Sequence, residues 1–78
     1  MKNQKKFAIT HVVKNEEEII KTFPDGNKDE ALAFGEEASK SFDVGLVVCI
    51  SALFNEDNER ADNTCWVYEV WKCEEKGG

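Results

Sequence analysis

The fold is decided by VGLVVCISALF at residues 44–54 and TCWVYEVWKC at residues 64–73, two apolar runs that flank nine mostly polar residues. Runs rich in Val, Ile, Tyr and Trp are typical of β-strands. The sequence therefore predicts one long hairpin, with its strands paired about Glu59. One face of that hairpin is large and apolar, and we expect it to pack on a helix. Its residues are Leu46, Val48, Ile50, Ala52, Phe54, Trp66, Tyr68 and Val70.

The opposite face of the predicted hairpin is apolar as well. It carries Val47, Cys49, Leu53, Cys65, Val67, Trp71 and Cys73, interrupted by Ser51 and Glu69. A single helix is about 10 to 12 Å wide and covers only one side of a sheet, so the second face is expected to stay open. An open apolar surface indicates an interaction site. The candidate interface residues are Val47, Cys49, Leu53, Val67 and Trp71, with Trp71 as the anchor.

Two shorter apolar runs, at residues 7–13 and 18–23, come first in the chain. They predict a second hairpin whose loop of about three residues is centred on Glu16. This register gathers the larger apolar side chains on one face. The expected pairs are Val13 with Ile19 and Ile9 with Phe23.

A helix is predicted from Lys28 to about Phe42, after a turn at residues 24–26. Asn27 and Glu30 have the spacing of a capping arrangement at its start. Small residues at helical spacing, including Gly35, are expected to let this helix lie close to the sheet. The apolar face of the helix consists of Ala31, Phe34, Ala38 and Phe42.

The element order ββαββ predicts the α+β class, as a two-layer sandwich with a four-stranded, mainly antiparallel sheet and one helix on one face. The 78 residues form a single domain, with residues 1–6 and 74–78 expected to be flexible tails. Two strand orders remain open. A right-handed crossover gives a wholly antiparallel sheet in the order 2-1-3-4, whereas a β-grasp fold would place the first and last strands parallel in the middle.

The composition limits the partners and the compartment. Sixteen Asp and Glu against ten Lys and Arg give a net charge of -6, which argues against binding to nucleic acid. No stretch is as long and apolar as a membrane span, and no signal peptide is apparent, so no membrane association is expected. An odd number of cysteines, three, fits reduced thiols and a cytoplasmic location.

No residue set indicates catalysis or metal binding. Cys65 and Cys73 are eight residues apart on one strand, about 26 Å at strand rise, and no C-x-x-C spacing exists. Nothing places a nucleophile and an orienting carboxylate near His11, the one histidine. The sequence therefore predicts a protein that is not an enzyme and that has no catalytic residue, metal or cofactor.

Two resemblances supplement this interpretation. The element order and the terminal Gly77-Gly78 resemble the ubiquitin-like and sulfur-carrier proteins, which implies activation of a terminal carboxylate, although residues 71–76 do not look like the tails of those families. The layout around residues 23–26 and 30–33 (FPDG and EALA) also resembles small proteins carried by conjugative transposons and phages of low-GC Gram-positive bacteria. Such proteins mostly lack an assigned activity, so this resemblance implies a mobile-element origin and no catalytic residue.

The leading functional hypothesis is a non-enzymatic module that uses the open sheet face to form a homodimer or to bind another protein. One alternative is a carrier protein with a functional Gly77-Gly78 terminus. A second alternative is an acidic mimic of nucleic acid, suggested by the charge of -6 and by the resemblance to mobile-element proteins.

Overall fold

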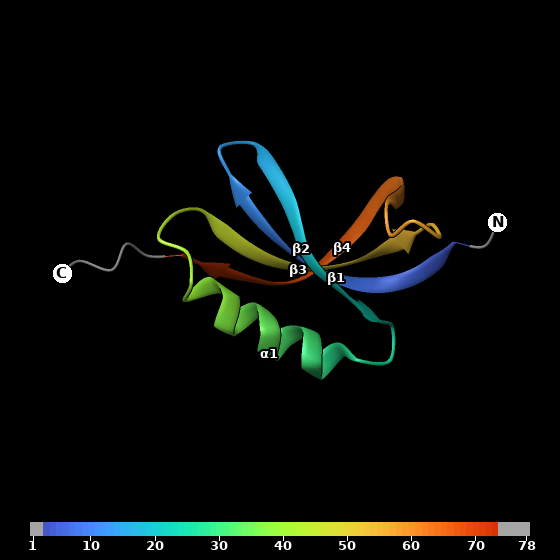
Figure 1. The fold of residues 1–78 in the computed structure, drawn as a ribbon, viewed down its shortest axis with the longest axis horizontal. Coiled ribbons are helices and arrows are strands. Elements are labelled where there is room, and N and C mark those ends of the chain that lie inside the picture. The colour runs from blue at the N-terminus through green and yellow to red at the C-terminus, as the bar shows by residue number, and fades with distance from the viewer. Residues whose placement is uncertain (1–2, 74–78) are drawn as a thin grey trace.

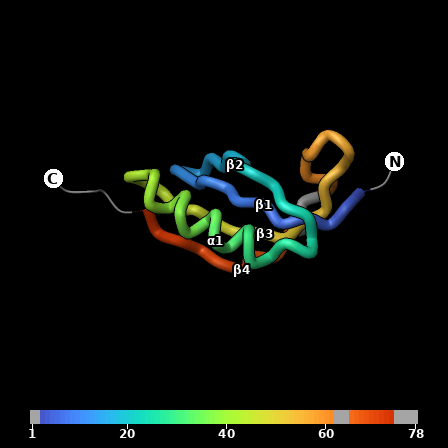
Figure 2. The backbone as a smooth tube through the Cα atoms, turned by 60° about the horizontal axis from the view of Figure 1, so that its bottom comes forward, coloured from blue at the N-terminus to red at the C-terminus, as the bar shows by residue number. Residues whose placement is uncertain are grey.

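The computed structural model describes residues 3–73, except for the side chains of residues 62–64. In chain order the elements are β1 (Gln4–Val13), β2 (Glu16–Pro24), α1 (Lys28–Ser39), β3 (Leu46–Phe54) and β4 (Arg60–Lys72) (Figure 1). The strands form one antiparallel sheet in the order β2-β1-β3-β4, and α1 lies against one of its faces (Figure 2). The predicted α+β class, with a helix and an antiparallel sheet, is confirmed.

Two expectations about the chain's layout are wrong. The β-grasp alternative fails because β4 lies at an edge of the sheet, where it pairs with β3 and not with β1. The expected tail at residues 1–6 is too long, because Gln4 already belongs to β1. The expected tail at residues 74–78 lies outside the described residues.

The first hairpin is tighter than predicted. Lys14 and Asn15 have φ values of 49° and 71°, so they form a two-residue turn of the kind that suits the twist of a hairpin. Val13 therefore pairs with Glu16, and the predicted pair of Val13 with Ile19 is wrong. Further along, Phe7 pairs with Phe23, and a register shift between Ile9 and Thr10 separates the two halves.

The helix starts where the sequence predicted but ends at Ser39, three residues before Phe42. Its start has no side-chain cap: the Asn27 side chain makes no hydrogen bond there, so the predicted capping arrangement with Glu30 is not formed. Instead, the Ala31 amide donates to the Asn27 carbonyl at 3.0 Å. Glu30 still lies in the first turn, where a negative charge suits the helix dipole.

The main core lies between α1 and the sheet. Phe7, Ile9, Phe23, Val47 and Cys49 are buried on this face. The predicted apolar face of the helix is confirmed, since Ala31 is fully buried and the other three residues pack on the same core. Those three residues are Phe34, Ala38 and Phe42. The helix comes closest to the sheet at Gly35, where an added Cβ would overlap the ring of Trp71.

A second apolar cluster lies on the face away from α1. Its buried residues are Ala8, Val48, Ile50, Ala52 and Phe54. No described helix covers them; the curl of the sheet does, because both hairpins bend away from α1 (Figure 1). The curl brings together diagonally opposite corners of the sheet, where Arg60 Nη1 of β4 lies 3.1 Å from Glu17 Oε1 of β2. Strand β3 separates the two clusters and is buried on both faces from Val47 to Ala52.

Within the described part of the chain, no helix has the length and apolar character needed to cross a bilayer.

Candidate interaction edge

Three of the five predicted interface residues lie under the helix instead of on an open face. Val47 and Cys49 are fully buried in the main core, and Trp71 is partly buried against Gly35. Leu53 is 38% exposed, but it belongs to the same side of β3 as Val47. Val67 is exposed and lies on the opposite side, paired with Ile50. The five residues therefore do not form one surface, and the predicted interface is wrong.

The error has a simple physical cause. Strand β3 is apolar on both faces, so its alternation does not say which face the helix covers. The predicted pairing about Glu59 is present in the half of the hairpin that is far from its turn, for example between Cys49 and Glu69. Register shifts after Cys49 and after Ala52 then break it. Trp66 and Tyr68, predicted to be core residues, lie on an edge strand and are exposed.

The largest exposed apolar feature is the middle of β4. Trp66, Val67, Tyr68 and Val70 are 59%, 60%, 44% and 46% exposed, and Glu69 between them is exposed too. β3 lies along one side of β4, and no described strand lies along the other (Figure 2). We name this segment, residues 66–70, the open edge. An edge strand of this kind presents its backbone N–H and C=O groups to any strand that approaches.

Side chains of the open edge point to both sides of the sheet. Tyr68 packs edge-on against Phe7 on the α1 side, with ring centroids 5.2 Å apart. Val67 pairs with Ile50, and Val70 pairs with Val48, both on the side away from α1. Five exposed positions that are divided between two faces are not part of one flat patch. What is left uncovered is the edge itself.

Two lysines lie over the aromatic rings of the open edge. Lys28 Nζ lies 5.2 Å from the ring centroid of Tyr68, and Lys5 Nζ lies 5.9 Å from that of Trp66. Contacts of this type stabilise an exposed ring by about 0.5 to 1 kcal/mol. These contacts favour the ring orientations seen here, which lowers the entropic cost of binding slightly.

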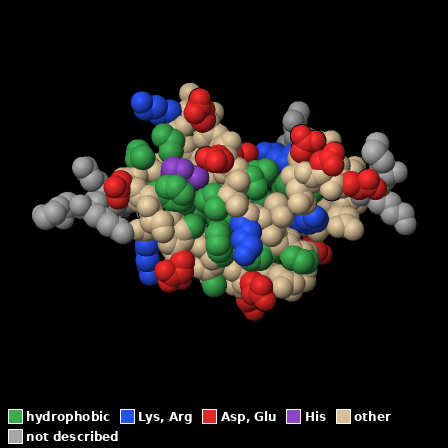
Figure 3. All heavy atoms as spheres, viewed as in Figure 1, with side chains coloured by type: hydrophobic (Ala, Val, Ile, Leu, Met, Phe, Trp, Pro, Cys, Tyr) green, Lys and Arg blue, Asp and Glu red, His purple; other side chains and the backbone are tan. Residues whose placement is uncertain are grey.

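The strand segment around the open edge has no net charge of its own. Between Cys65 and Lys72 the only charged residues are Glu69 and Lys72, one of each sign. The whole chain carries -6, so the acidic residues lie elsewhere. On the side shown in Figure 3, hydrophobic side chains gather over the middle of the molecule and acidic ones lie mostly toward its rim. Repulsion therefore opposes a second acidic chain less at the open edge than elsewhere.

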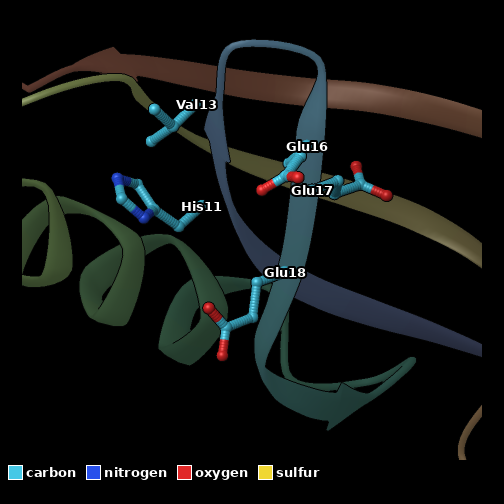
Figure 4. Close-up of a pocket in the computed structure, with 5 residues that line it drawn as sticks. All are labelled: His11, Val13, Glu16, Glu17 and Glu18. Carbon is cyan, nitrogen blue, oxygen red and sulfur yellow. The ribbon is translucent and has the colours of Figure 1, made fainter.

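A hollow near the first turn is lined by His11, Val13 and residues 16–18 (Figure 4). The carboxylates of the three glutamates point in different directions, and that of Glu17 pairs with Arg60. His11 Nε2 donates to the Val44 carbonyl at 2.8 Å, and its ring stacks on Phe42 at 3.7 Å. His11 and Glu17 are held by structural contacts, and the carboxylates of the hollow do not converge on a point where a substrate could react.

Two of the three cysteines, Cys49 and Cys73, are buried and poorly reactive. Burial raises the pKa of Cys49, with a further contribution from Glu69, and burial alone raises the pKa of Cys73. A raised pKa keeps a thiol protonated near neutral pH, where it is a poor nucleophile and metal ligand. In the described range, residues 3–73, no group of three or more His, Cys, Asp or Glu side chains is arranged to hold a metal ion.

Comparisons with protein-family profiles, with curated proteins and with solved structures found no match to this chain. Gly77-Gly78, the basis of the carrier hypothesis, lies outside the described residues. We therefore derive the function from the residues of the open edge.

Proposed function

We propose that this protein is a non-enzymatic interaction module that binds a protein chain by pairing a strand with the open edge of β4. One observation carries the proposal: Trp66 to Val70 are all exposed, and four of these five consecutive residues are large and apolar. In this proposal the domain is a two-layer ββαββ sandwich whose helix stabilises the sheet and leaves one edge free.

Strand addition fits the open edge better than packing of a partner on one face. An added strand lies beside both rows of side chains, so it covers Trp66 on the α1 side and Val67 on the other side together. A helix on one face would leave the other row in water. Backbone hydrogen bonds supply affinity, and the aromatic rings supply the anchors that dominate binding energy in many interfaces.

The remaining chemistry supports a binding role in a reducing compartment. Cys49, Cys65 and Cys73 are all free thiols, as expected for a cytoplasmic protein. The histidine is occupied by a structural hydrogen bond and a ring stack. His11 and Glu17 of the hollow are therefore engaged in holding the fold, and the largest exposed apolar feature left for function is the open edge.

Site-specific photo-crosslinking in living cells tests this function. A photoreactive phenylalanine analogue replaces Val67 on β4 in one strain and Ile19 on β2 in another; both positions are partly or largely exposed on edge strands. We expect covalent adducts larger than one chain from position 67 and none from position 19. Equal adducts from both positions, or none from position 67, would contradict the proposal.

A further inference from the structure

We infer that the strand that pairs with the open edge is β4 of a second copy of this chain, in an antiparallel dimer with a continuous eight-stranded sheet. This inference rests on the proposed function and names its partner. The two-fold axis would pass between Tyr68 and Glu69, so that each β4 pairs with itself. Such an interface is isologous and closes after two chains.

The bulge in β4 makes this register possible. Cys49 pairs with Glu69 and Ile50 pairs with Val67, so Tyr68 is an extra residue in β4. In a regular strand, residues equally distant from a midpoint between two neighbours point to opposite faces. The extra residue cancels this mismatch: Val67 and Val70 both point away from α1, and Trp66 and Trp71 both point toward it.

The backbone directions also match. Val70 and Val67 pair with Val48 and Ile50, which are two residues apart on β3. Residues two apart direct their N–H and C=O groups to the same side of a strand, so Val67 and Val70 have the same hydrogen-bonding phase. In the proposed dimer, Val67 of each copy lies opposite Val70 of the other. Residues that lie opposite each other in the two copies then point their side chains to the same face of the sheet. Their backbone hydrogen-bonding groups also match.

Charges favour this arrangement over the other edge. In the proposed register, Glu69 lies opposite Tyr68 and Lys72 lies opposite Cys65, so no like charges are directly opposed, although the two Glu69 residues lie diagonally across the axis. Pairing of β4 with β2 of another copy would instead place the three consecutive glutamates at residues 16–18 inside the interface. That contact would also be heterologous and would not close.

The dimer is expected to be weak and to depend on salt. About eight residues per strand, from Cys65 to Lys72, make a small interface, and we expect a dissociation constant on the order of 0.1 mM. Each copy carries -6 while the interface is neutral, so added salt screens repulsion between the copies. Raising the salt from about 20 to 200 mM is expected to strengthen the dimer several-fold. A contact held by attraction between charged groups would weaken.

Sedimentation equilibrium of the whole chain from 10 µM to 1 mM tests the inference. The weight-average mass is expected to rise toward that of two chains. Val67→Lys should abolish the rise, whereas Ile19→Lys, a matched change on β2, should leave it unchanged. Both variants must unfold in urea at the wild-type midpoint. A mass of one chain throughout would overturn the inference, yet adducts of position 67 to a different protein would still support the proposed function.

Disulfide trapping tests the register. In a Cys65→Ser background, a Val67→Cys chain mixed with a Val70→Cys chain should form a disulfide-linked pair under mild oxidation. Each variant alone should form at least tenfold less, because identical positions lie about 10 Å apart along the strands. Equal yields from the mixture and from the single variants would overturn the register.

Discussion

The two edge strands of this sheet are built differently. β2 carries three consecutive glutamates at residues 16–18 and ends at Pro24. Charges and proline are among the devices by which natural sheets keep their edges from joining other strands. β4 exposes Trp66 to Val70 and has only Glu69 as a charge in that segment. One edge is protected, and the other is available for pairing.

The contrast between β2 and β4 shows where the uncovered apolar surface lies. The sequence suggested a whole sheet face without a cover, but the curl of the sheet buries that face around Ile50 and Phe54. Of the eight large apolar residues that are exposed in the described chain, four lie in residues 66–70, whereas β2 contributes only Ile19, at 36%. A small domain that exposed such residues only for lack of core material is expected to spread them more evenly over its two edges. We therefore interpret the open edge as a binding feature.

Removing the charges that protect β2 should have the largest effect on association. In a Glu16→Thr, Glu18→Thr double variant both edges could pair, so chains could join in series beyond the dimer. Light scattering at about 0.5 mM is expected to show assemblies of several chains. Glu36→Thr with Glu37→Thr on the exposed side of α1 changes the net charge equally and should not do so. Assembly of both variants to the same extent would mean that charge alone controls association.

Gly35→Ala tests how β4 is attached to the helix. The added methyl group would overlap the Trp71 ring, and overpacking of this kind costs about 1 to 3 kcal/mol, partly offset by better helix propensity. Urea unfolding should show the loss. At Gly26 an added Cβ meets nothing within 4 Å, so Gly26→Ala should change the free energy of unfolding by less than about 0.5 kcal/mol. Equal stability of the two variants would show that Trp71 is not held tightly.

Glu17→Gln should have the smallest effect. The pair of Glu17 with Arg60 joins β2 to β4 across the curl, and pairs this exposed are worth about 0.2 to 1 kcal/mol. A double-mutant cycle with Arg60→Ala isolates this coupling energy from other effects. Glu37→Gln, which removes a 4.0 Å contact with Lys40 on the surface, is the matched control and should show no measurable coupling. A zero coupling for Glu17 and Arg60 would mean that apolar packing alone closes the curl.

Local sequence patterns were sufficient for much of the fold. Alternation and strand-forming residues predicted the strands, and helical spacing predicted the face of α1 that carries Ala31 and Phe34. The register of the first hairpin was not predictable from apolar matching. It depends on the left-handed conformations of Lys14 and Asn15, which shorten the loop by one residue.

The candidate site was much harder to predict. Of the five expected interface residues, only Val67 belongs to the open edge. Which face of β3 the helix covers depends on packing across the whole sheet, and both faces offer apolar side chains. The exposure of Trp66 and Tyr68 depends on edge position and on the curl, which alternation along one strand does not encode. A signal was present in the contrast between the glutamates of residues 16–18 and the single charge, Glu69, of residues 66–70.

Strand β3 is packed on both faces, with one apolar cluster on each side. From Val47 to Ala52 no side chain has solvent to expand into, so a larger residue on either face must displace an existing neighbour. Homologous chains should therefore vary least in this strand. Its amide hydrogens should be the last to exchange with heavy water, since only disruption of both layers at once would release them.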